Sequence, residues 1–331
     1  MKAVVFDRYG GPELLRLEDV ETPTPSAGEV RVRIAAAGVA TGDRHVMRGQ
    51  PFLVRLVFGL RRPRLRTLGS DVSGRVDAVG PGVTSLRVGD EVFGSTADHG
   101  FGGFAEYVAA PATAFVPKPA RSSWVDAAAV PGSALTALQA LRRAGVSPDA
   151  EPGLRVLING ASGGVGTFAV QIARAYGAHV TGVCSGPNVA LVRSLGADHV
   201  IDYTMEDFRT GGARWDAIVD TAAHRPFRES LPALVSGGRY VFVGGSSGPT
   251  NRAMLLGPVW SRLSDKTVAF LISSATPDDL EELARLLSLG ELRPVVERTF
   301  ALEEVPEAIR WLESGEGRGK IVVDLARGPA A

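Results

Sequence analysis

The chain lacks the features that would tie it to a membrane, a nucleic acid or an oxidising compartment. Its 331 residues contain a single cysteine, Cys184, so no disulfide can form within the chain. No apolar run approaches the ~20 residues that a membrane-spanning helix requires. The 36 basic and 36 acidic residues cancel, which argues against general nucleic-acid binding. Met1 leads directly into a predicted strand rather than a signal sequence, and we therefore expect a cytoplasmic protein.

A glycine-rich turn between two predicted strands is the most informative motif. Residues 156–158 read as a buried strand, and Gly160, Gly163 and Gly166 follow with the spacing GxxGxxG. Glycines let a pyrophosphate approach the N–H groups and the positive dipole at the start of the next helix. Apolar residues then recur at three and four residue intervals as far as Gly177, which predicts an amphipathic helix. A dinucleotide site is therefore predicted, against the alternative of a turn without a ligand.

The end of the second strand discriminates between cofactors. An NAD site usually has Asp or Glu there to bind the ribose 2′-OH, but this chain has Cys184, Ser185 and Gly186. A carboxylate would repel the 2′-phosphate of NADP, whereas Ser185 and Asn188 could donate hydrogen bonds to it. No cation stands beside them, and the candidates that would have to reach the phosphate are Arg193, Arg318 and Lys320. Charge complementarity favours NADPH over NADH.

The order of predicted elements divides the chain into two domains. Residues 1–125 have short alternating runs separated by turns, which predicts an all-β, barrel-like domain. Residues 126–273 alternate strands with helices, as in a doubly wound parallel sheet of the α/β class. We expect its strands at 155–160, 179–184, 199–203, 217–221, 239–245 and 267–272, with helices near 164–176, 187–195 and 225–235. Residues 274–331 are too few for a third domain and should complete the first.

Seven motifs in order resemble those of the medium-chain dehydrogenase/reductase superfamily. They are GVATGDRHVMRG at 38–49, LGSDVSGRVDAVGPGVTSLRVGDEVFG at 68–94, GGFAEYV at 102–108, PGSALTALQAL at 131–141, NGASGGVG at 159–166, LGADHVIDY at 195–203 and GKIVV at 319–323. The resemblance is to the zinc-free quinone oxidoreductase and enoyl reductase branch. It implies a GroES-like, β-barrel-type catalytic domain and a Rossmann NADP-binding domain.

The positions of zinc ligands in the metal-dependent members differ in this chain. Where those members have a ligand cysteine and a Gly-His-Glu motif, this chain has Ala40, Ser70 and Asp71. His45, Asp71 and His99 match no known ligand spacing, and we expect no metal site. Without zinc to stabilise a localised alkoxide, the expected reaction is hydride transfer to a quinone or an α,β-unsaturated carbonyl. A zinc-free NADP-dependent alcohol dehydrogenase and a non-catalytic NADPH-binding relative remain alternatives.

His45 is the candidate catalytic residue. It occupies a position where quinone reductases of this family often have tyrosine, and it could give a hydrogen bond or a proton to the substrate oxygen. The alternative is a histidine that only fills the pocket wall. Asp43 and Arg48 are expected to hold each other. The expected substrate pocket residues are Ala40, Phe52, Leu53 and Ser70.

The segment 51–66 combines apolar residues with five arginines. We expect a loop or short helix that covers a pocket for a bulky hydrophobic substrate. A helix that binds a membrane surface or a partner is the alternative.

Ligands in parallel sheets bind at the carboxyl ends of the strands, and together with the resemblance this assigns the cofactor contacts. The expected cofactor-binding residues are Thr136, Ala161, Ser162, Gly163, Gly164, Val165, Gly166, Cys184, Ser185, Asn188, Tyr203, Thr221, Gly244, Gly245, Leu271 and Lys320. By resemblance, Tyr203 should lie beside the 2′-phosphate. Relatives commonly dimerise through an edge strand, here the apolar run 267–272, and we expect a homodimer.

Overall fold

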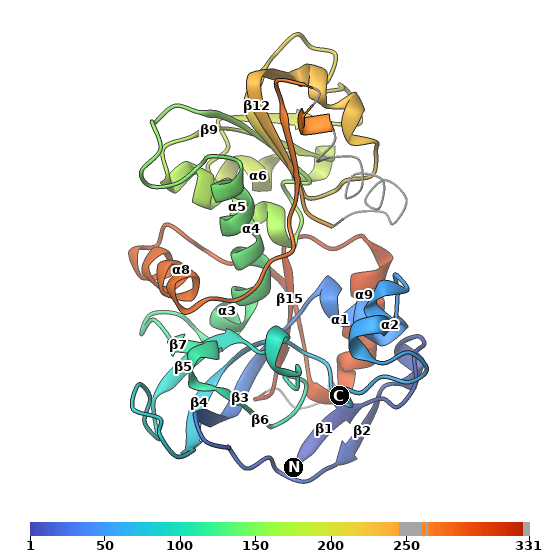
Figure 1. Cartoon of the computed structure of the whole chain (residues 1–331), viewed down its shortest axis with the longest axis vertical. Helices are drawn as coiled ribbons and strands as arrows, with labels where there is room; N and C mark the ends of the chain where they lie inside the picture. Colours follow the sequence, from blue (N-terminus) through green and yellow to red (C-terminus); the bar gives the residue numbers. More distant parts are fainter. Residues whose placement is uncertain (245–259, 263, 327–331) are drawn as a thin grey trace. The chain divides into compact units, whose positions relative to one another are not determined.

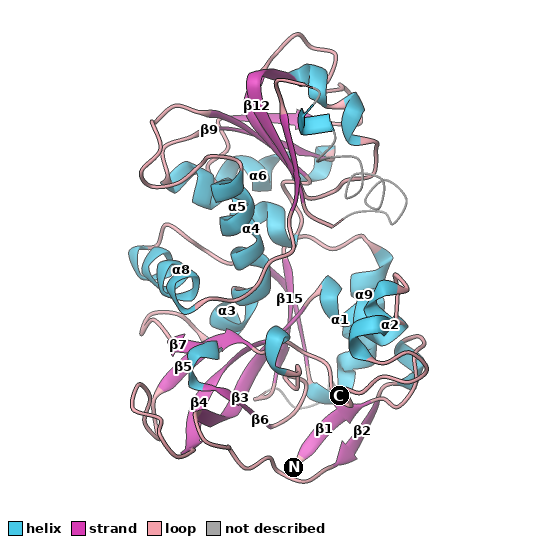
Figure 2. Cartoon of the chain, in the orientation of Figure 1, coloured by secondary structure: helices cyan, strands magenta, loops and turns pink. Residues whose placement is uncertain are grey.

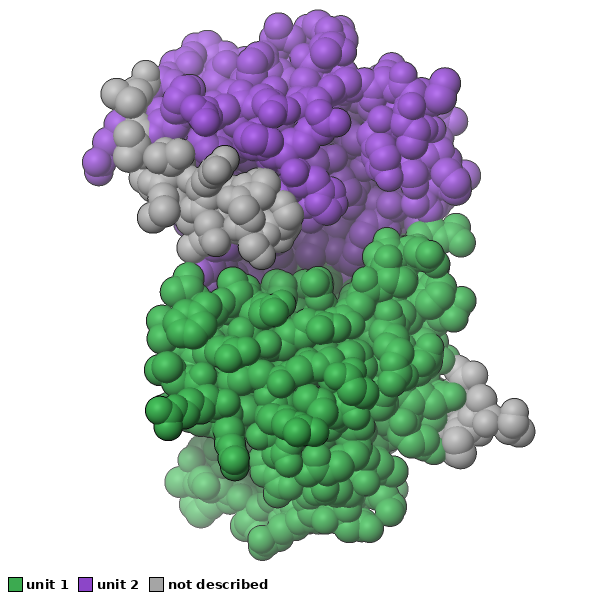
Figure 3. All heavy atoms as spheres, turned by 90° about the vertical axis from the view of Figure 1, so that its right-hand side faces the viewer, with its two compact units in different colours: residues 1–135, 274–290, 294–331 green, residues 136–273, 291–293 purple. Residues whose placement is uncertain are grey.

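The structure is a computed structural model that describes residues 1–244, 260–262 and 264–326 (Figure 1). The chain forms two compact units, which Figure 3 colours separately. Unit 1 contains Met1–Leu135, Ser274–Gly290 and Pro294–Ala331, and unit 2 contains Thr136–Ser273 and Glu291–Arg293. Helix α4 (Pro131–Arg143) carries the chain from the first unit into the second.

Unit 2 is built on a six-stranded parallel sheet in the order β10-β9-β8-β11-β12-β13. The strands are β8 (Arg155–Asn159), β9 (His179–Cys184), β10 (His199–Asp202), β11 (Trp215–Asp220), β12 (Leu234–Phe242) and β13 (Thr267–Phe270). The chain begins at the central strand β8, runs outward to β10, and returns to the other side as far as β13. This is the doubly wound arrangement predicted from the sequence, and β13 is the expected edge strand.

Helices of unit 2 pack on the first half of the sheet. Helix α5 (Gly164–Ala175) contacts β8 and β9, and α6 (Val189–Ser194) contacts β9 and β10. The predicted helix near 225–235 is wrong, because two 3-10 turns, Phe227–Glu229 and Leu231–Ala233, lead into β12. Pro232 lacks a backbone N–H and its ring would collide with the preceding turn of an α-helix.

Unit 1 contains a seven-stranded mixed sheet (Figure 2). Its order is β14-β15-β3-β4-β5-β7, and β6 also pairs with β3. The strands are β3 (Glu29–Val39), β4 (Asp71–Val79), β5 (Glu91–Ser95), β6 (Tyr107–Pro111), β7 (Phe115–Pro117), β14 (Val296–Phe300) and β15 (Lys320–Asp324), beside a separate pair β1 (Lys2–Val5) and β2 (Arg16–Asp19). The C-terminal strand β15 therefore lies inside the sheet that the N-terminal residues begin.

The all-β prediction for residues 1–125 is wrong for two short segments, where α1 (Thr41–Arg48) and the start of α3 (Trp124–Ala129) form. Helix α2 (Leu53–Phe58) lies in the segment 51–66, for which the sequence predicts a loop or short helix. The left-handed residue Gly49, with φ of 59°, ends α1. Two later helices, α8 (Pro277–Leu289) and α9 (Val305–Ser314), complete unit 1. Within the residues described, no helix has the length and apolar character needed to cross a bilayer.

Candidate functional site

The glycine turn lies at the carboxyl end of β8, as predicted. Gly160 has a φ of 82°, and the N–H groups of Gly160 and Ala161 both donate to the carbonyl oxygen of Val183 at 3.1 and 2.9 Å. A Cβ on Gly166 would lie 2.0 Å from the Gly160 oxygen, so only glycine permits this close packing of helix and turn. Thr221 follows β11 and donates from its hydroxyl to the oxygen of Asn159 at 2.8 Å. The turn is therefore tied to β9 and to the loop after β11.

Helix α5 begins at this turn with its first amides open. Gly163 is its N-cap and supplies no side-chain hydrogen bond. The first N–H groups of an α-helix have no partner within the helix, and here the end of the helix dipole adds partial positive charge. Gly164 and Val165, the first two residues of the helix, are half-buried, so this end of the helix is partly accessible to solvent. The arrangement can bind an anion such as a pyrophosphate.

The loop after β9 holds an unpaired buried acceptor. Asn188 donates from its side-chain nitrogen to the Ser185 hydroxyl oxygen at 3.0 Å, while its Oδ1 is buried without a hydrogen-bond partner among the described residues. Buried polar atoms normally have partners, so this oxygen is an acceptor that the described residues leave unsatisfied. The Ser185 hydroxyl keeps its own proton to donate. Cys184 is 2% exposed, and burial raises the pKa of its thiol.

A carboxylate missed in the prediction from sequence lies beside this loop. Asp202 ends β10 in register with Cys184, and a Cβ on Gly186 would lie 2.7 Å from its Oδ2. Hydrogen bonds from the amide and hydroxyl of Thr204, at 2.9 and 2.7 Å, lower the pKa of Asp202, which is therefore ionised. The prediction considered only residues at the end of β9, whereas applying the strand-end rule to the neighbouring strand would have found Asp202.

The other predicted cofactor residues of unit 2 lie at or near the same strand ends. Tyr203 is 63% exposed and donates from its amide to the Cys184 oxygen at 3.1 Å. The Thr136 hydroxyl lies 2.8 Å from that of Ser273, and Leu271 is buried and bonds to the Phe242 oxygen through its amide. Ala161 is buried and Ser162 half-buried in the glycine turn, and Gly244 is exposed with a φ of 66°. Gly245 lies outside the described residues.

Unit 1 contains a buried polar cluster around β4 and β15. Asp71 is fully buried, and its Oδ2 lies 3.7 Å from the ammonium nitrogen of Lys320, which is 3% exposed. Lys320 donates to the Val39 oxygen at 3.3 Å and to the Ser133 hydroxyl at 3.0 Å, while Ser70 donates to Asp71 Oδ1 at 3.2 Å. Burial raises the pKa of Asp71, and the charge of Lys320 opposes that shift. The Lys320 ammonium thus has protein partners, and its contact with a cofactor phosphate stays a prediction.

Asp43 joins the start of α1 to the loop before β4. Its two carboxylate oxygens accept from the amides of Ala40 and Gly69, each at 2.8 Å. The side chain is fully buried, and this burial raises its pKa to about 7. The predicted Asp43–Arg48 pair is wrong: Arg48 binds Glu313 of α9 instead, with Nη2 to Oε2 at 2.6 Å. Residues five apart on a helix do not share a face, so Asp43 points inward and Arg48 outward.

His45 lies on α1 and is half-buried. Burial, and secondarily the charge of Arg44, lower its pKa, so the imidazole is neutral near pH 7 and can still donate one hydrogen bond. Of the predicted pocket residues, Ala40 is half-buried and Ser70 is buried, whereas Phe52 and Leu53 are 61% and 58% exposed. Their roles toward a substrate stay predictions.

The histidines and carboxylates of unit 1 do not form a metal-binding group. Across residues 1–244, 260–262 and 264–326, no three His, Cys, Asp or Glu side chains gather in a way that could hold a metal ion. Asp71 instead faces the ammonium of Lys320, and His99 is exposed.

Two family models match parts of the chain. Residues 26–120 match an alcohol dehydrogenase GroES-like domain, and residues 195–323 match a zinc-binding dehydrogenase. Across nearly the whole length, the chain is 34% identical to mouse NAD(P)H oxidoreductase RTN4IP1, mitochondrial, covering 98% of this chain and 89% of the mouse protein. It is 33% identical to the trans-enoyl reductase pgmF of Aspergillus terreus, covering 90% of this chain and 86% of the fungal one.

A solved structure supports the same relationship. The quinone oxidoreductase of Coxiella burnetii is 31% identical, with a TM-score of 0.87 over 98% of this chain and 99% of the bacterial one. The similarity therefore extends over both units rather than over the dinucleotide motif alone.

Proposed function

The chain belongs to the medium-chain dehydrogenase/reductase superfamily and is an oxidoreductase, and we propose that it is an NADPH-dependent, zinc-independent reductase of quinones or α,β-unsaturated carbonyls. The observation that carries this proposal is that the amide end of α5 and the unpaired Asn188 oxygen follow the carboxyl ends of two neighbouring strands, β8 and β9. Both features are sites for groups that a dinucleotide has, a pyrophosphate and a ribose hydroxyl. The names of the relatives are consistent with a nicotinamide cofactor.

A bound nicotinamide dinucleotide would supply a hydride to the substrate. The α5 amides would hold its pyrophosphate, and the Ser185 hydroxyl would donate to the 2′-phosphate that distinguishes NADPH. Asp202 opposes this preference, because its ionised carboxylate lies beside the same loop. We therefore propose a modest preference for NADPH. The remaining contacts are proposed for Thr136, Ala161, Ser162, Tyr203, Thr221, Gly244, Gly245, Leu271 and Lys320.

The polar cluster of unit 1 supports chemistry without zinc. Lys320 balances the charge of Asp71, and Ala40 and Ser70 replace the cysteine and histidine that would bind a metal. Hydride transfer to a quinone or to the β-carbon of an enone develops negative charge that is delocalised over several atoms. One or two hydrogen-bond donors can stabilise such an oxyanion. The proposed acceptor is therefore a quinone or an enone rather than a saturated ketone.

His45 is the proposed donor to the substrate oxygen. Its lowered pKa keeps the ring neutral near pH 7, so the donor is an imidazole N–H rather than an imidazolium ion. A neutral imidazole can stabilise the developing oxyanion, and either it or water then supplies the proton. The proposal needs no further charged group in the substrate pocket.

Steady-state assays of NADPH oxidation test the proposal with four substrates: a quinone, an enone, a saturated ketone and an alcohol. We expect turnover with the quinone or the enone, no turnover with the ketone, and the same rates after dialysis against a metal chelator. His45→Phe should lower kcat roughly a hundredfold, whereas His45→Tyr keeps a donor and should retain most activity. His99→Phe, at an exposed histidine of the same unit, is the matched control.

Three outcomes would contradict the proposal. Reduction of NADP by the alcohol would indicate an alcohol dehydrogenase, and loss of activity with the chelator would indicate a metal enzyme. Binding of NADPH without oxidation by any substrate would indicate a non-catalytic relative.

We also propose a homodimer that pairs along β13, since this apolar strand lies at the edge of the unit 2 sheet. The molar mass of the purified protein, measured by light scattering, tests this proposal. A monomer at all protein concentrations would contradict it. A cytoplasmic location stays a prediction.

A further inference from the structure

Helix α2 is apolar on both of its faces. Val54 and Phe58 pack against the core of unit 1, and the Phe58 ring meets the ring of Phe101 edge-on with centroids 5.8 Å apart. A second set of apolar side chains in α2 and beside its ends is exposed to solvent, at intervals of three and four residues from 52 to 60. These residues are 55–66% exposed: Phe52, Leu53, Leu56, Val57 and Leu60. A helix that is apolar all round is normally buried, and a concentrated exposed apolar patch marks an interaction surface.

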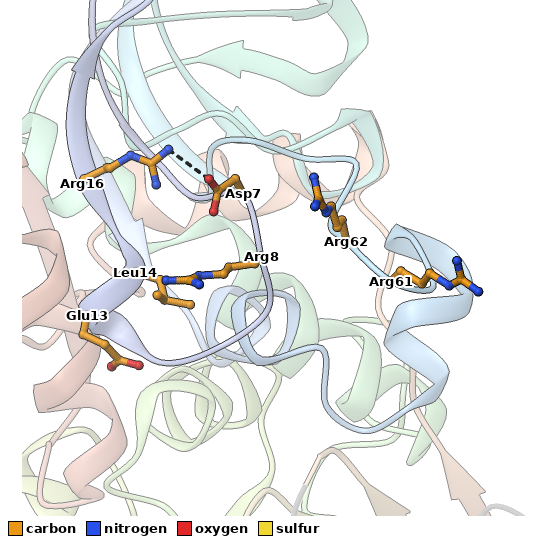
Figure 4. A pocket seen from close by; sticks show the side chains of 7 residues that line it. All are labelled: Asp7, Arg8, Glu13, Leu14, Arg16, Arg61 and Arg62. Atoms are coloured by element: carbon orange, nitrogen blue, oxygen red, sulfur yellow. Dashed lines mark hydrogen bonds and ion pairs between the residues drawn. The ribbon is translucent and has the colours of Figure 1, made fainter.

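A positively charged cavity involves the residues that follow this helix. Its volume is about 670 Å³, and it is lined by Asp7, Arg8, Glu13, Leu14, Arg16, Arg61 and Arg62. Figure 4 shows Arg16 joined to Asp7, with Arg8 and Arg62 around the same hollow. Arg8, Arg61 and Arg62 form no ion pair with any residue that the structure describes. The cavity can therefore offer guanidinium groups to an anion.

The charge of the segment 51–66 has one sign. It contains five arginines and no Asp or Glu. Among the described residues, Arg55 lies over the Tyr9 ring, with its guanidinium carbon 4.7 Å from the centroid, and Arg66 pairs with Glu18 at 3.3 Å. A second copy of the chain docked symmetrically on this face would bring like charges together, which disfavours self-association. An apolar surface bordered by arginines complements the surface of a lipid bilayer, in which headgroup phosphates lie over the acyl chains.

We propose that α2 and the arginines that follow it form a docking surface for a bilayer containing anionic phospholipids. Leu56 and Val57 enter the boundary of the acyl chains, and Arg61 and Arg62 bind headgroup phosphates. Arginine suits this role because its planar guanidinium pairs with phosphate through two hydrogen bonds. The surface is peripheral, and the proposal depends on Leu56, Val57, Arg61 and Arg62 rather than on the predicted pocket residues Phe52 and Leu53.

Vesicle co-sedimentation tests the proposal with the purified full chain. One vesicle population is pure phosphatidylcholine, and the other also contains phosphatidylglycerol. We expect binding to the anionic vesicles, weakened by added salt, and little binding to the neutral ones. Each arginine near an anionic surface contributes ~1 kcal/mol, so Arg61→Gln with Arg62→Gln should weaken binding roughly thirtyfold. Leu56→Ser with Val57→Ser should weaken it about tenfold or more through lost apolar burial.

The matched control changes the same residue types elsewhere in unit 1. Arg87 and Val88 are both exposed, and Arg87→Gln with Val88→Ser should leave vesicle binding unchanged. Each double variant should have the same Tm as the natural chain, since the six side chains substituted in the three variants are all exposed. Absence of binding to anionic vesicles, or equal binding by both α2-region variants and the natural chain, would overturn the proposal. The proposal would also be overturned if the Leu56→Ser, Val57→Ser variant kept its binding to vesicles and lost only the self-association measured by light scattering.

Discussion

Replacement of Lys320 by methionine should destabilise unit 1 by about 3–5 kcal/mol. The ammonium of Lys320 lies 3.7 Å from the Asp71 carboxylate, and both residues are at most 3% exposed. With an effective dielectric constant of about 20, Coulomb's law gives an attraction of about 4.5 kcal/mol at this distance. Removal of one partner from a buried pair costs about as much, because the other charge stays buried alone.

The cost should depend on pH. Burial already raises the pKa of Asp71, and the loss of Lys320 removes the charge that opposes this shift. In the variant the folded-state pKa lies further above the unfolded value of ~3.9, so the folded protein binds a proton more readily than the unfolded chain does. The free energy of unfolding of Lys320→Met therefore rises as the pH falls through that folded-state pKa toward 4. Its deficit relative to the natural chain is greatest at neutral and higher pH.

Urea unfolding monitored by tryptophan fluorescence measures this effect. Trp124 and Trp311 lie in unit 1, so a background that carries Trp215→Phe and Trp260→Phe reports on that unit. Addition of Asp71→Asn to Lys320→Met removes both charges and should recover at least half of the lost stability. The reasoning is refuted if Lys320→Met stays within about 1 kcal/mol of the natural chain at pH 7. The reasoning is also refuted if the losses of unfolding free energy caused by Lys320→Met and Asp71→Asn simply add in the double variant.

Three further predictions concern the other groups of the sites. In Gly166→Ala, a Cβ would lie 2.0 Å from the Gly160 oxygen, so calorimetry should show NADPH affinity falling more than about tenfold, whereas Gly211→Ala, with open space around it, should bind normally. Asp43 has a folded-state pKa of about 7, above ~3.9 in the unfolded chain, so the free energy of unfolding should fall as pH rises from 4 to 7, by up to about 4 kcal/mol. Asp43→Asn should flatten that slope in urea titrations at a series of pH values, and an unchanged slope would assign it to other groups. Asp202→Asn should raise the ratio of kcat/KM for NADPH over NADH about tenfold, since it removes a negative charge beside the 2′-phosphate site; an unaltered ratio would place that site elsewhere.

The Rossmann sheet could be predicted because its signals are local. Buried strands, the glycine spacing and the periodicity of α5 all lie within thirty consecutive residues, and the alternation of strands and helices indicates a doubly wound parallel sheet. The failed helix near 225–235 shows the limit of periodicity: its apolar spacing fits a helix, but Pro232 forbids one.

Contacts between distant residues could not be predicted in the same way. Asp202 and Cys184 face each other only because β10 and β9 pair in a particular register, which the strand patterns alone leave open. The strand-end rule alone places Asp202 at the same edge of the sheet as Cys184, whereas its closeness to Gly186 depends on that register. Lys320 lies beside the buried Asp71, a contact that the sequence does not indicate, and Asp43 binds two amides rather than Arg48. A charged side chain in a sequence does not reveal which buried partner the fold will give it.

The position of β15 has a consequence for how the protein is made. This strand lies between β14 and β3, and its Lys320 contacts Val39, which is 281 positions earlier in the chain. The ribosome therefore delivers all of unit 2 before the strand that closes the sheet of unit 1. Unit 2 can fold while unit 1 still exposes the edge of β3 at residues 36–39, where β15 later pairs. During synthesis that exposed edge is where a chaperone would be needed, and a premature stop before residue 320 would leave it permanently open.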